Sequence, residues 1–349
     1  MKPYFIYPGT FCPPTYGHLY VVREACKVFP QVTILCSENE DKKDNRWFTP
    51  DECKAMWQAY KLPKNVEVMT LKEFMASKFK KAKITMIRGI RGHEDLEHET
   101  KVMELNTREF GINQYFYIHA PLSKCKISSS RTRAYATELD LEKLSKLVAP
   151  GIVSKLLAHV LEVKKVFIVA AKPGSGKSTF LQKLHELDSC NYFINTDDFN
   201  HQLRDFLREK SSEPDLIKLA TEDEAKLKHL IKKPWFDLLA TALKQAPKNG
   251  HIFVEVPYCM QSDKRMYRFL GANIIYVYCD EAKLRYRVIK RGTPEILPFI
   301  EKIPGVHETR EICERENLRL QVIDANQGIA ELEEAAKNFH QQLQGENYA

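Results

Sequence analysis

The chain has 349 residues, 44% of them hydrophobic, and its 53 basic and 46 acidic residues give a formal net charge of +7. No segment reaches the roughly 18 apolar residues of a membrane-spanning helix, the N-terminus lacks the pattern of a signal peptide, and the 9 cysteines include no CxxC pair. We therefore expect a cytoplasmic protein of two folded domains without a disulfide framework or zinc site, whose positive charge serves polyanionic small molecules rather than a membrane or nucleic acid.

Apolar runs typical of strands alternate with helical patterns through the first 160 residues. The predicted strands are 3–7, 31–36, 65–69, 83–89 and 114–119, and the predicted helices are 17–29, 50–60, 71–80 and 94–110. In the first helix Val22, Ala25, Cys26 and Phe29 recur at the spacing of one buried face. This alternation predicts a parallel sheet that is covered on both sides.

A second series of the same kind follows. Its predicted strands are 164–171, 191–194, 251–256, 273–279 and 320–324, again separated by helices. The segment 140–162 has a helical pattern, and we expect it to close the first domain and link it to the second. The sequence therefore predicts two α/β domains, residues 1–160 and 161–349, each built on a doubly wound parallel sheet.

The first strand–helix junction carries GTFCPPTYGH, residues 9–18, in which Thr15-Tyr16-Gly17-His18 matches the [HT]-x-G-H motif of nucleotidyltransferases. Gly17 permits close approach of a nucleotide, and we expect His18 at the helix N-terminus, facing a phosphate. Its imidazole can stabilise the charge that builds up when a phosphate oxygen attacks the α-phosphorus of ATP. If the TYGH motif is considered alone, His18 could equally be a surface histidine that only caps the helix.

Two further clusters favour the phosphate-binding interpretation. Residues 127–133, ISSSRTR, place hydroxyls, backbone amides and arginines at a second helix start, a combination suited to a triphosphate. Arg88 and Arg91 lie at the C-terminal end of a predicted strand, where the ligands of parallel sheets collect.

The order TxGH, RGxR, ISSS resembles the phosphopantetheine adenylyltransferase family over residues 3–160. The resemblance extends to YPGTF (7–11), FTPDE (48–52) and GIRGHEDLEHE (89–99), the last of which related adenylyltransferases for nicotinamide nucleotides lack. It implies adenylyl transfer from ATP to 4′-phosphopantetheine, giving dephospho-coenzyme A and pyrophosphate. It assigns Thr10, Phe11 and Arg88 to the substrate, His18 and Lys42 to catalysis, and Gly17, His18, Arg91, Glu99, Ser128, Ser129 and Ser130 to ATP. Lys43 could replace Lys42, because the loop around both is longer than usual.

In the second half the pattern G-x-x-x-x-G-K-[ST] appears as AKPGSGKS, residues 171–178, between a predicted strand and a predicted helix. Lys177 should reach the β- and γ-phosphates of ATP, and the Ser178 hydroxyl should ligate Mg²⁺. The predicted ATP ligands are Pro173, Gly174, Ser175, Gly176, Lys177, Ser178 and Thr179. Ala171 occupies the first glycine position, where a methyl group fits if φ stays negative.

Two acidic residues and a basic helix complete the second candidate site. Asp197 could take the proton of an acceptor hydroxyl and Asp198 could lie near the metal, although either could instead cap the following helix. The basic residues of segment 281–292 could close over the transferring phosphoryl group as a lid, with a solvated helix face as the alternative for any one of them. We single out Arg287 and Arg291 for this role.

The whole second half resembles the dephospho-coenzyme A kinase family in its phosphate loop, INTD (194–197), EVPYCMQS (255–262) and VIDANQG (322–328). By this resemblance Asp197 is the base that activates the ribose 3′-hydroxyl, and Arg287 or Arg291 is the lid arginine. Ala171 departs from the family, as do Lys233, which precedes a proline where histidine is usual, and Gln261, where glutamate is usual.

Together the resemblances imply a bifunctional coenzyme A biosynthesis enzyme, with a Rossmann-like nucleotidyltransferase in residues 1–160 and a P-loop NTPase-type kinase in residues 161–349. Its small-molecule ligands would be ATP, 4′-phosphopantetheine and dephospho-coenzyme A, and its cofactor would be Mg²⁺. The sequence leaves open whether the chain forms a homo-oligomer. One alternative is that the kinase phosphorylates another acceptor, such as a nucleoside or a nucleic-acid end. Another is that the second domain binds ATP and regulates the first without catalysis.

Overall fold

The computed structural model describes residues 2–38, 46–77, 82–210, 219, 224–256, 267, 270–271 and 273–345. Internal contacts divide the chain into two compact units, which are described separately. Unit 1 comprises Met1–Glu138 and Lys143–Ile152, and unit 2 comprises Leu139–Glu142 and Val153–Ala349. Among the helices that fall in the described ranges, none is long and apolar enough to cross a membrane.

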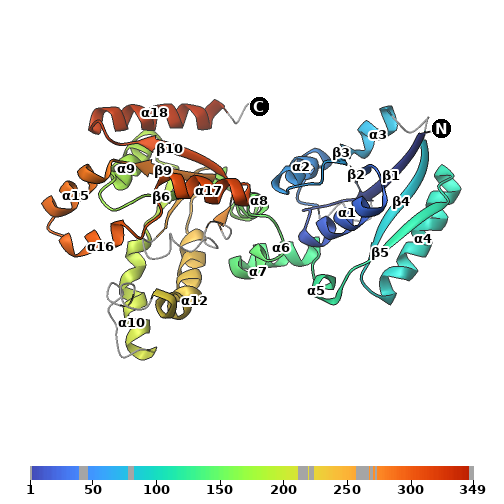
Figure 1. The fold of residues 1–349 in the computed structure, drawn as a ribbon, viewed down its shortest axis with the longest axis horizontal. Coiled ribbons are helices and arrows are strands. Elements are labelled where there is room, and N and C mark those ends of the chain that lie inside the picture. The colour runs from blue at the N-terminus through green and yellow to red at the C-terminus, as the bar shows by residue number, and fades with distance from the viewer. Residues whose placement is uncertain are drawn as a thin grey trace. The chain divides into compact units, whose positions relative to one another are not determined.

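The centre of unit 1 is a five-stranded parallel sheet (Figure 1). Its strands are β1 (Lys2–Gly9), β2 (Val32–Cys36), β3 (Val66–Thr70), β4 (Ala82–Ile90) and β5 (Gln114–His119), in the order β3-β2-β1-β4-β5. The chain leaves β1 to one side for β2 and β3 and places β4 on the other side. The crevice between the carboxyl ends of β1 and β4 is therefore the switch point at which such sheets bind ligands.

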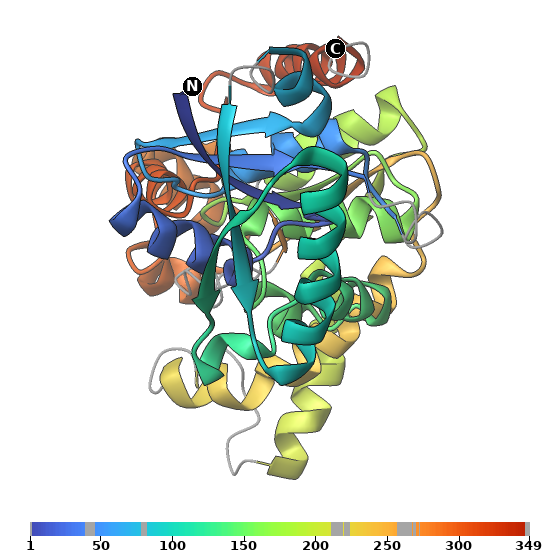
Figure 2. The same cartoon turned by 90° about the vertical axis from the view of Figure 1, so that its right-hand side faces the viewer.

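Helices cover both faces of this sheet. They are α1 (Tyr16–Val28), α2 (Pro50–Met56), α3 (Leu71–Ser77), α4 (His93–Phe110), α5 (Leu122–Cys125) and α6 (Ser129–Glu138), with a 3₁₀ turn at Trp57–Ala59. One face packs Ile6, Leu35, Ile84 and Met86 around Phe74 of α3, and Figure 2 shows α4 beside β4 and β5. The other face receives α1, where Val22 and Ala25 are fully buried as the sequence pattern predicts.

Unit 2 has its own five-stranded parallel sheet. Its strands are β6 (Lys165–Ala170), β7 (Tyr192–Ile194), β8 (His251–Glu255), β9 (Asn273–Tyr278) and β10 (Arg319–Asp324), in the order β10-β9-β6-β8-β7. The first strand, β6, lies between β8 and β9 and is buried along most of its length. The loop after β6 therefore leaves from the switch point of this sheet.

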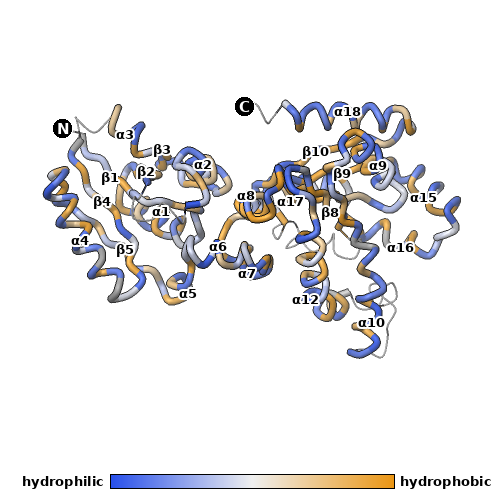
Figure 3. The backbone as a smooth tube through the Cα atoms, turned by 180° about the vertical axis from the view of Figure 1, so that it is seen from behind, coloured by the Kyte–Doolittle hydropathy of each residue, from blue (hydrophilic) through white to orange (hydrophobic). Residues whose placement is uncertain are grey.

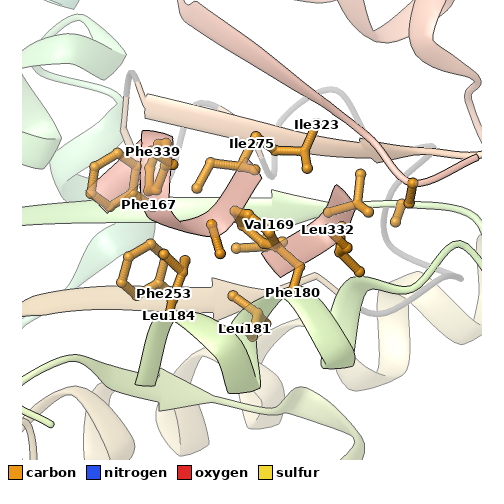
Figure 4. Packing of buried hydrophobic residues seen from close by; sticks show 14 of the residues in the cluster. Phe167, Val169, Phe180, Leu181, Leu184, Phe253, Ile275, Ile323, Leu332 and Phe339 are labelled. Carbon is orange, nitrogen blue, oxygen red and sulfur yellow. The ribbon is translucent and has the colours of Figure 1, made fainter. Parts of the chain in front are cut away.

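The core of unit 2 lies between this sheet and the two helices α9 (Lys177–Leu187) and α18 (Ile329–Gly345). Figure 4 shows Phe167, Val169, Phe253 and Ile275 of the sheet packed against Phe180, Leu184, Leu332 and Phe339 of these helices. The other helices in the described ranges are α7 (Leu141–Ser145) and α8 (Pro150–Leu161), which span the division between the units, and α10 (Asn200–Lys210), α12 (Glu224–Leu243), α15 (Glu281–Lys290), α16 (Leu297–Ile300) and α17 (Val306–Glu316) of unit 2, with 3₁₀ turns η4 (Thr196–Phe199) and η5 (Pro294–Ile296). In Figure 3 the apolar α8 is largely orange and the polar α10 largely blue.

All ten predicted strands are present, and both sheets are parallel as expected. The predicted helical segment 140–162 differs, because it forms two helices, α7 and α8, separated by residues 146–149. Pro150 explains the break, since proline has no backbone N–H and disfavours helical backbone in the residue before it.

Candidate functional site

His18 lies in the first turn of α1, at the carboxyl edge of the unit 1 sheet. The Thr15 hydroxyl accepts a hydrogen bond from the His18 backbone N–H (3.4 Å), and His18 Nδ1 accepts one from the Thr15 backbone N–H (3.1 Å). This reciprocal capping box satisfies two backbone donors and fixes the imidazole ring at the helix N-terminus.

The capping box also determines which nitrogen of His18 carries the proton. Because Nδ1 accepts a hydrogen bond from a backbone N–H, the proton of the neutral ring lies on Nε2. Burial and the positive charge of Arg91 lower the pKa of His18 to about 4, so the ring is neutral at pH 7. His18 therefore offers one Nε2–H donor at a helix N-terminus, a position that attracts anions.

The loop between β1 and α1 supports this ring from behind. Phe11 is only 3% exposed, has a φ of +45°, and meets the rings of His18 and Trp57 edge-on with centroid distances of 5.1 and 5.2 Å. A left-handed φ is rare for a residue other than glycine, so the ring packing holds this backbone in place. Thr10 is half-buried beside it. Contact of Thr10 and Phe11 with a substrate stays a prediction.

The TYGH and ISSS motifs, far apart in the sequence, lie against each other. A Cβ atom on Gly17 would lie 3.0 Å from the carbonyl oxygen of Ile127, so the glycine permits this approach. Ser129 Oγ donates to the carbonyl of Pro13 (2.8 Å), and Arg133 Nη1 donates to that of Cys12 (2.5 Å). Both contacts tie the start of α6 to the β1–α1 loop, so two helix N-termini border one site.

The other two serines of the motif differ in exposure. Ser128 is half-buried, and its hydroxyl accepts a hydrogen bond from the backbone N–H of Arg131 (3.2 Å). Ser130 is exposed in the first turn of α6. Each hydroxyl therefore lies near the free N–H groups of a helix start, an arrangement that can bind phosphate oxygens.

Arg88 and Glu99, which the sequence assigns to different ligands, form one ion pair. Arg88 Nε and Nη2 donate to the two Glu99 carboxylate oxygens (2.5 and 2.6 Å), and Nη1 donates to the carbonyl of Pro8 (3.2 Å). Arg91 Nε and Nη2 likewise donate to Asp95 (3.1 and 3.2 Å). Arg88 of β4 and Arg91 of the loop after β4 are thus each held by a carboxylate of α4. Both lie close to the crevice between β1 and β4.

In unit 2, residues 171–176 connect β6 to α9. Gly174 and Gly176 have φ values of +79° and +101°, which favour glycine, and a Cβ on Gly174 would lie 3.2 Å from the carbonyl of Leu284. Ala171 has a negative φ, and its methyl group packs in the apolar core with Pro173 buried nearby. The departure at the first glycine position thus fits the backbone.

Lys177, which follows this glycine-containing loop, has an acidic partner. Lys177, the first residue of α9, forms an ion pair with Glu255 Oε2 at 3.0 Å, and the two residues are 8% and 7% exposed. Glu255 is the last residue of β8, the neighbour of β6. The two buried charges therefore compensate each other at the carboxyl edge of the sheet.

The predicted metal ligands lie at the same carboxyl edge of the sheet. Ser178 is exposed and Thr179 half-buried in the first turn of α9, and Asp198 is exposed in η4, directly after β7. Asp197 belongs to the same 3₁₀ turn. Within the described ranges no group of three or more His, Cys, Asp or Glu side chains could hold a metal ion by itself. These residues fit Mg²⁺ that arrives with nucleotide phosphates as most of its ligands.

Arg287 contacts the loop between β6 and α9 directly. Its Nη1 donates to the carbonyls of Gly174 (3.2 Å) and Ser175 (3.4 Å), and its Nη2 donates to the carbonyl of Ala325 (3.3 Å). Arg291, by contrast, is exposed at the C-cap of α15. The two candidate lid arginines therefore have different surroundings.

Some predicted residues lie outside the described part, and some contacts were not predicted. Lys42, Lys43 and Gln261 fall in segments 39–45 and 257–266, which the structure does not describe, whereas Lys233 is exposed and pairs with Asp237 (2.7 Å). The contacts of Glu255 with Lys177 and of Arg133 with Cys12 were not predicted from the sequence. The signal for Glu255 was a carboxylate at the end of an otherwise apolar strand, HIFVEV.

Residues 6–135 match the cytidylyltransferase-like family. Over 130 residues the chain is 32% identical to phosphopantetheine adenylyltransferase of Campylobacter jejuni strain RM1221, a match that covers 37% of this chain and 82% of that protein. The same figures hold for the enzyme of Campylobacter jejuni subsp. doylei.

Two solved structures also resemble the chain. Plasmodium falciparum nicotinic acid mononucleotide adenylyltransferase complexed with NaAD covers 45% of this chain and 95% of its own, with 16% identity and a TM-score of 0.34. The NadR protein in complex with NAD and AMP-PNP covers 98% of this chain and 96% of its own, with 14% identity and a TM-score of 0.33.

Proposed function

Since the chain belongs, through residues 6–135, to the cytidylyltransferase-like family and has phosphopantetheine adenylyltransferases among its relatives, we propose that unit 1 transfers the adenylyl group of ATP to 4′-phosphopantetheine. A phosphate oxygen of phosphopantetheine attacks the α-phosphorus, a new P–O bond forms, and the bond to the β-phosphate oxygen breaks. Dephospho-coenzyme A and pyrophosphate are the products. No covalent enzyme intermediate is needed.

The observation that carries this proposal is the neutral His18 ring at the N-terminus of α1. Its Nε2–H can donate to a phosphate oxygen as negative charge builds up, without a change in the protonation of the ring. The start of α6, which lies against α1, supplies backbone N–H groups and the Ser128 and Ser130 hydroxyls for the triphosphate, while the Ser129 hydroxyl ties it to the β1–α1 loop. Arg88 and Arg91 supply positive charge for the acceptor phosphate and for ATP.

Mass spectrometry of products tests this proposal. The chain is incubated with ATP, Mg²⁺ and either 4′-phosphopantetheine or nicotinate mononucleotide, and pyrophosphate release is followed in parallel. We expect dephospho-coenzyme A from the first acceptor and no dinucleotide from the second. Adenylylation of nicotinate mononucleotide alone would disprove the choice of acceptor while leaving the adenylyl transfer intact.

For unit 2 we propose phosphorylation of the ribose 3′-hydroxyl of dephospho-coenzyme A. The hydroxyl oxygen attacks the γ-phosphorus of ATP, Asp197 takes its proton, and ADP leaves. The two left-handed glycines, Lys177 at the start of α9 and its position at the sheet's switch point support the binding of nucleotide phosphates. When bound, Mg²⁺ would neutralise phosphate charge, with Ser178 and Asp198 as the residues of this chain that would hold it.

Labelled ATP separates this proposal from its alternatives. We expect transfer of the γ-phosphoryl group to dephospho-coenzyme A and loss of that transfer in Asp197→Ala. Transfer to a nucleoside or a nucleic-acid end instead would assign unit 2 to another acceptor. ATP binding with no transfer to any acceptor would favour a regulatory domain.

A further inference from the structure

A surface cavity of about 840 Å³ lies on the unit 2 sheet, away from the phosphate loop. It is lined by the first residues of β6, β9 and β10 and by the last turns of α18. Because all five strands are parallel, these amino ends lie at the edge opposite to the carboxyl ends that carry the P-loop. The cavity is therefore separate from the proposed kinase site.

The strand register explains the chemistry of its floor. Phe193, Phe253 and Phe167 are neighbours on β7, β8 and β6, and their rings stack with centroid distances of 5.1 and 5.0 Å. The same row continues through Asn273 of β9 to Arg319 of β10, which are paired in register. Across these neighbouring strands the side chains change from phenylalanines to the polar Asn273 and Arg319 where the cavity opens. Phe167 therefore forms an apolar floor beside these two polar side chains.

The walls add cations and amides. Lys165 and Arg319 line the cavity, and Gln321 donates from Nε2 to Gln342 Oε1 (2.8 Å), which joins β10 to α18 across it. Leu343 adds to the apolar side, and Figure 4 shows Phe339 next to Phe167. None of the described lining residues is acidic, so the cavity favours negative charge.

We propose that this cavity binds a small organic anion that carries an aromatic ring. The anionic group would lie between Arg319 and Lys165, and the ring would pack on Phe167, with the amides of Asn273 and Gln321 as hydrogen-bond partners. The volume lies within the range of about 300–1,000 Å³ that is usual for small-molecule sites. A nucleotide site is not required for this binding, so the inference holds whichever acceptor unit 2 phosphorylates.

The probe for the test is the aromatic sulfonate 8-anilinonaphthalene-1-sulfonate, whose fluorescence rises in apolar surroundings. The full chain is titrated in saturating ATP and Mg²⁺ without an acceptor, so that the nucleotide sites are filled. We expect saturable binding with one site per chain. Arg319→Glu should weaken it at least about tenfold, and Arg319→Lys should keep it within about threefold, because the lysine restores the charge.

Two matched pairs of variants separate a local effect from a general one. Arg310→Glu makes the same charge change on an exposed residue of α17 that does not line the cavity, and it should leave binding unchanged. Gln342→Glu places a carboxylate in the cavity from an exposed helical position, whereas Gln341→Glu on the same helix does not. Gln342→Glu should therefore weaken binding even if Arg319→Glu fails to fold. Absence of saturable binding, or equal weakening by Gln341→Glu and Gln342→Glu, would overturn the proposal.

Discussion

His18 caps α1 through Nδ1, and in the proposed reaction it donates through Nε2. We expect His18→Ala to lower the kcat of adenylyl transfer by about 10²–10³, the usual cost of removing one donor to developing charge. It should also destabilise α1 by about 1 kcal/mol, because the capping box is lost. Pyrophosphate release and urea unfolding measure the two effects.

His18→Gln separates these two roles. A glutamine at the third helical position can keep the capping box, so stability should return to within a few tenths of a kcal/mol. The glutamine amide replaces the Nε2–H donor of histidine only in part. We therefore expect an adenylyl transfer activity between those of His18→Ala and the parent chain. Full activity in His18→Ala would contradict the role of the ring.

The Arg287 guanidinium donates to two carbonyls of the loop between β6 and α9 and to that of Ala325, so we predict that it also fixes this loop. We expect Arg287→Ala to raise the KM for ATP in phosphoryl transfer at least about tenfold, and Arg287→Lys to restore little, since an ammonium cannot reach the three acceptors with a planar fork. Arg291→Ala should lower kcat with little change in KM. If Arg287→Ala and Arg291→Ala lowered kcat equally and left KM unchanged, both arginines would instead act as lid residues.

The sequence predicted the features that depend on local backbone. His18, Gly174, Gly176 and Lys177 stand at strand–helix junctions, where the motif and the helix start together determine the backbone conformation. The partners of these residues could not be predicted in the same way. The contact of Lys177 with Glu255 depends on which strand lies next to β6, which no local pattern encodes.

At the scale of elements, Gly89 fixes how closely α1 approaches the sheet of unit 1. A Cβ at Gly89 would lie 2.7 Å from Val21 Cγ2 of α1, so an added methyl group forces the helix or the strand to shift. We expect Gly89→Ala to lower the free energy of unfolding of unit 1 by about 1–3 kcal/mol, the usual cost of overpacking.

Gly92→Ala is the control for this substitution. Gly92 has an extended φ of −172° at the N-cap of α4, and a Cβ there would meet nothing within 4 Å. Urea unfolding of the two variants should therefore differ clearly. Equal stability of Gly89→Ala and the parent chain would mean that α1 does not lie as close to β4 as described.

The elements themselves were predictable because each strand is a short apolar run bounded by turns and each helix has one buried face, as the burial of all five residues of β2 and of β8 illustrates. The order of the strands within each sheet was not predictable from the sequence. The position of β6 between β8 and β9 depends on long-range packing, including that of α9 and the last helix, α18, on the sheet, and such packing leaves no local trace in the sequence.

At the scale of the whole molecule, two neutral histidines make stability depend on pH. Burial, followed by the charges of Lys164 and Lys165, lowers the pKa of His251 to about 4, with Asp188 opposing and His340 adding to the effect. His18 has the same depressed value in unit 1. An unfolded histidine has a pKa near 6.5, so between about pH 6.5 and 4 the unfolded chain binds more protons, and stability falls as pH falls.

For His251 this loss amounts to about 2 kcal/mol between pH 7 and pH 5. Hydrogen exchange of unit 2 peptides at both pH values measures it. His251→Leu should remove most of the decline in unit 2 and leave that of unit 1 unchanged. An identical pH dependence in the variant would mean that the pKa of His251 is not lowered in the folded chain.

The division into two units leads us to expect two activities that can be lost separately. Each has its own sheet, and the residues of each candidate site come from one unit. We expect His18→Ala to remove pyrophosphate release and leave phosphoryl transfer, and Lys177→Ala to do the reverse. Because Lys177→Ala leaves Glu255 buried without its cation, at a cost of about 3–5 kcal/mol, the double variant Lys177→Ala/Glu255→Gln serves as the control for folding. If one of these changes eliminates both activities in a chain whose two units remain folded, the sites are coupled and the two-site interpretation fails.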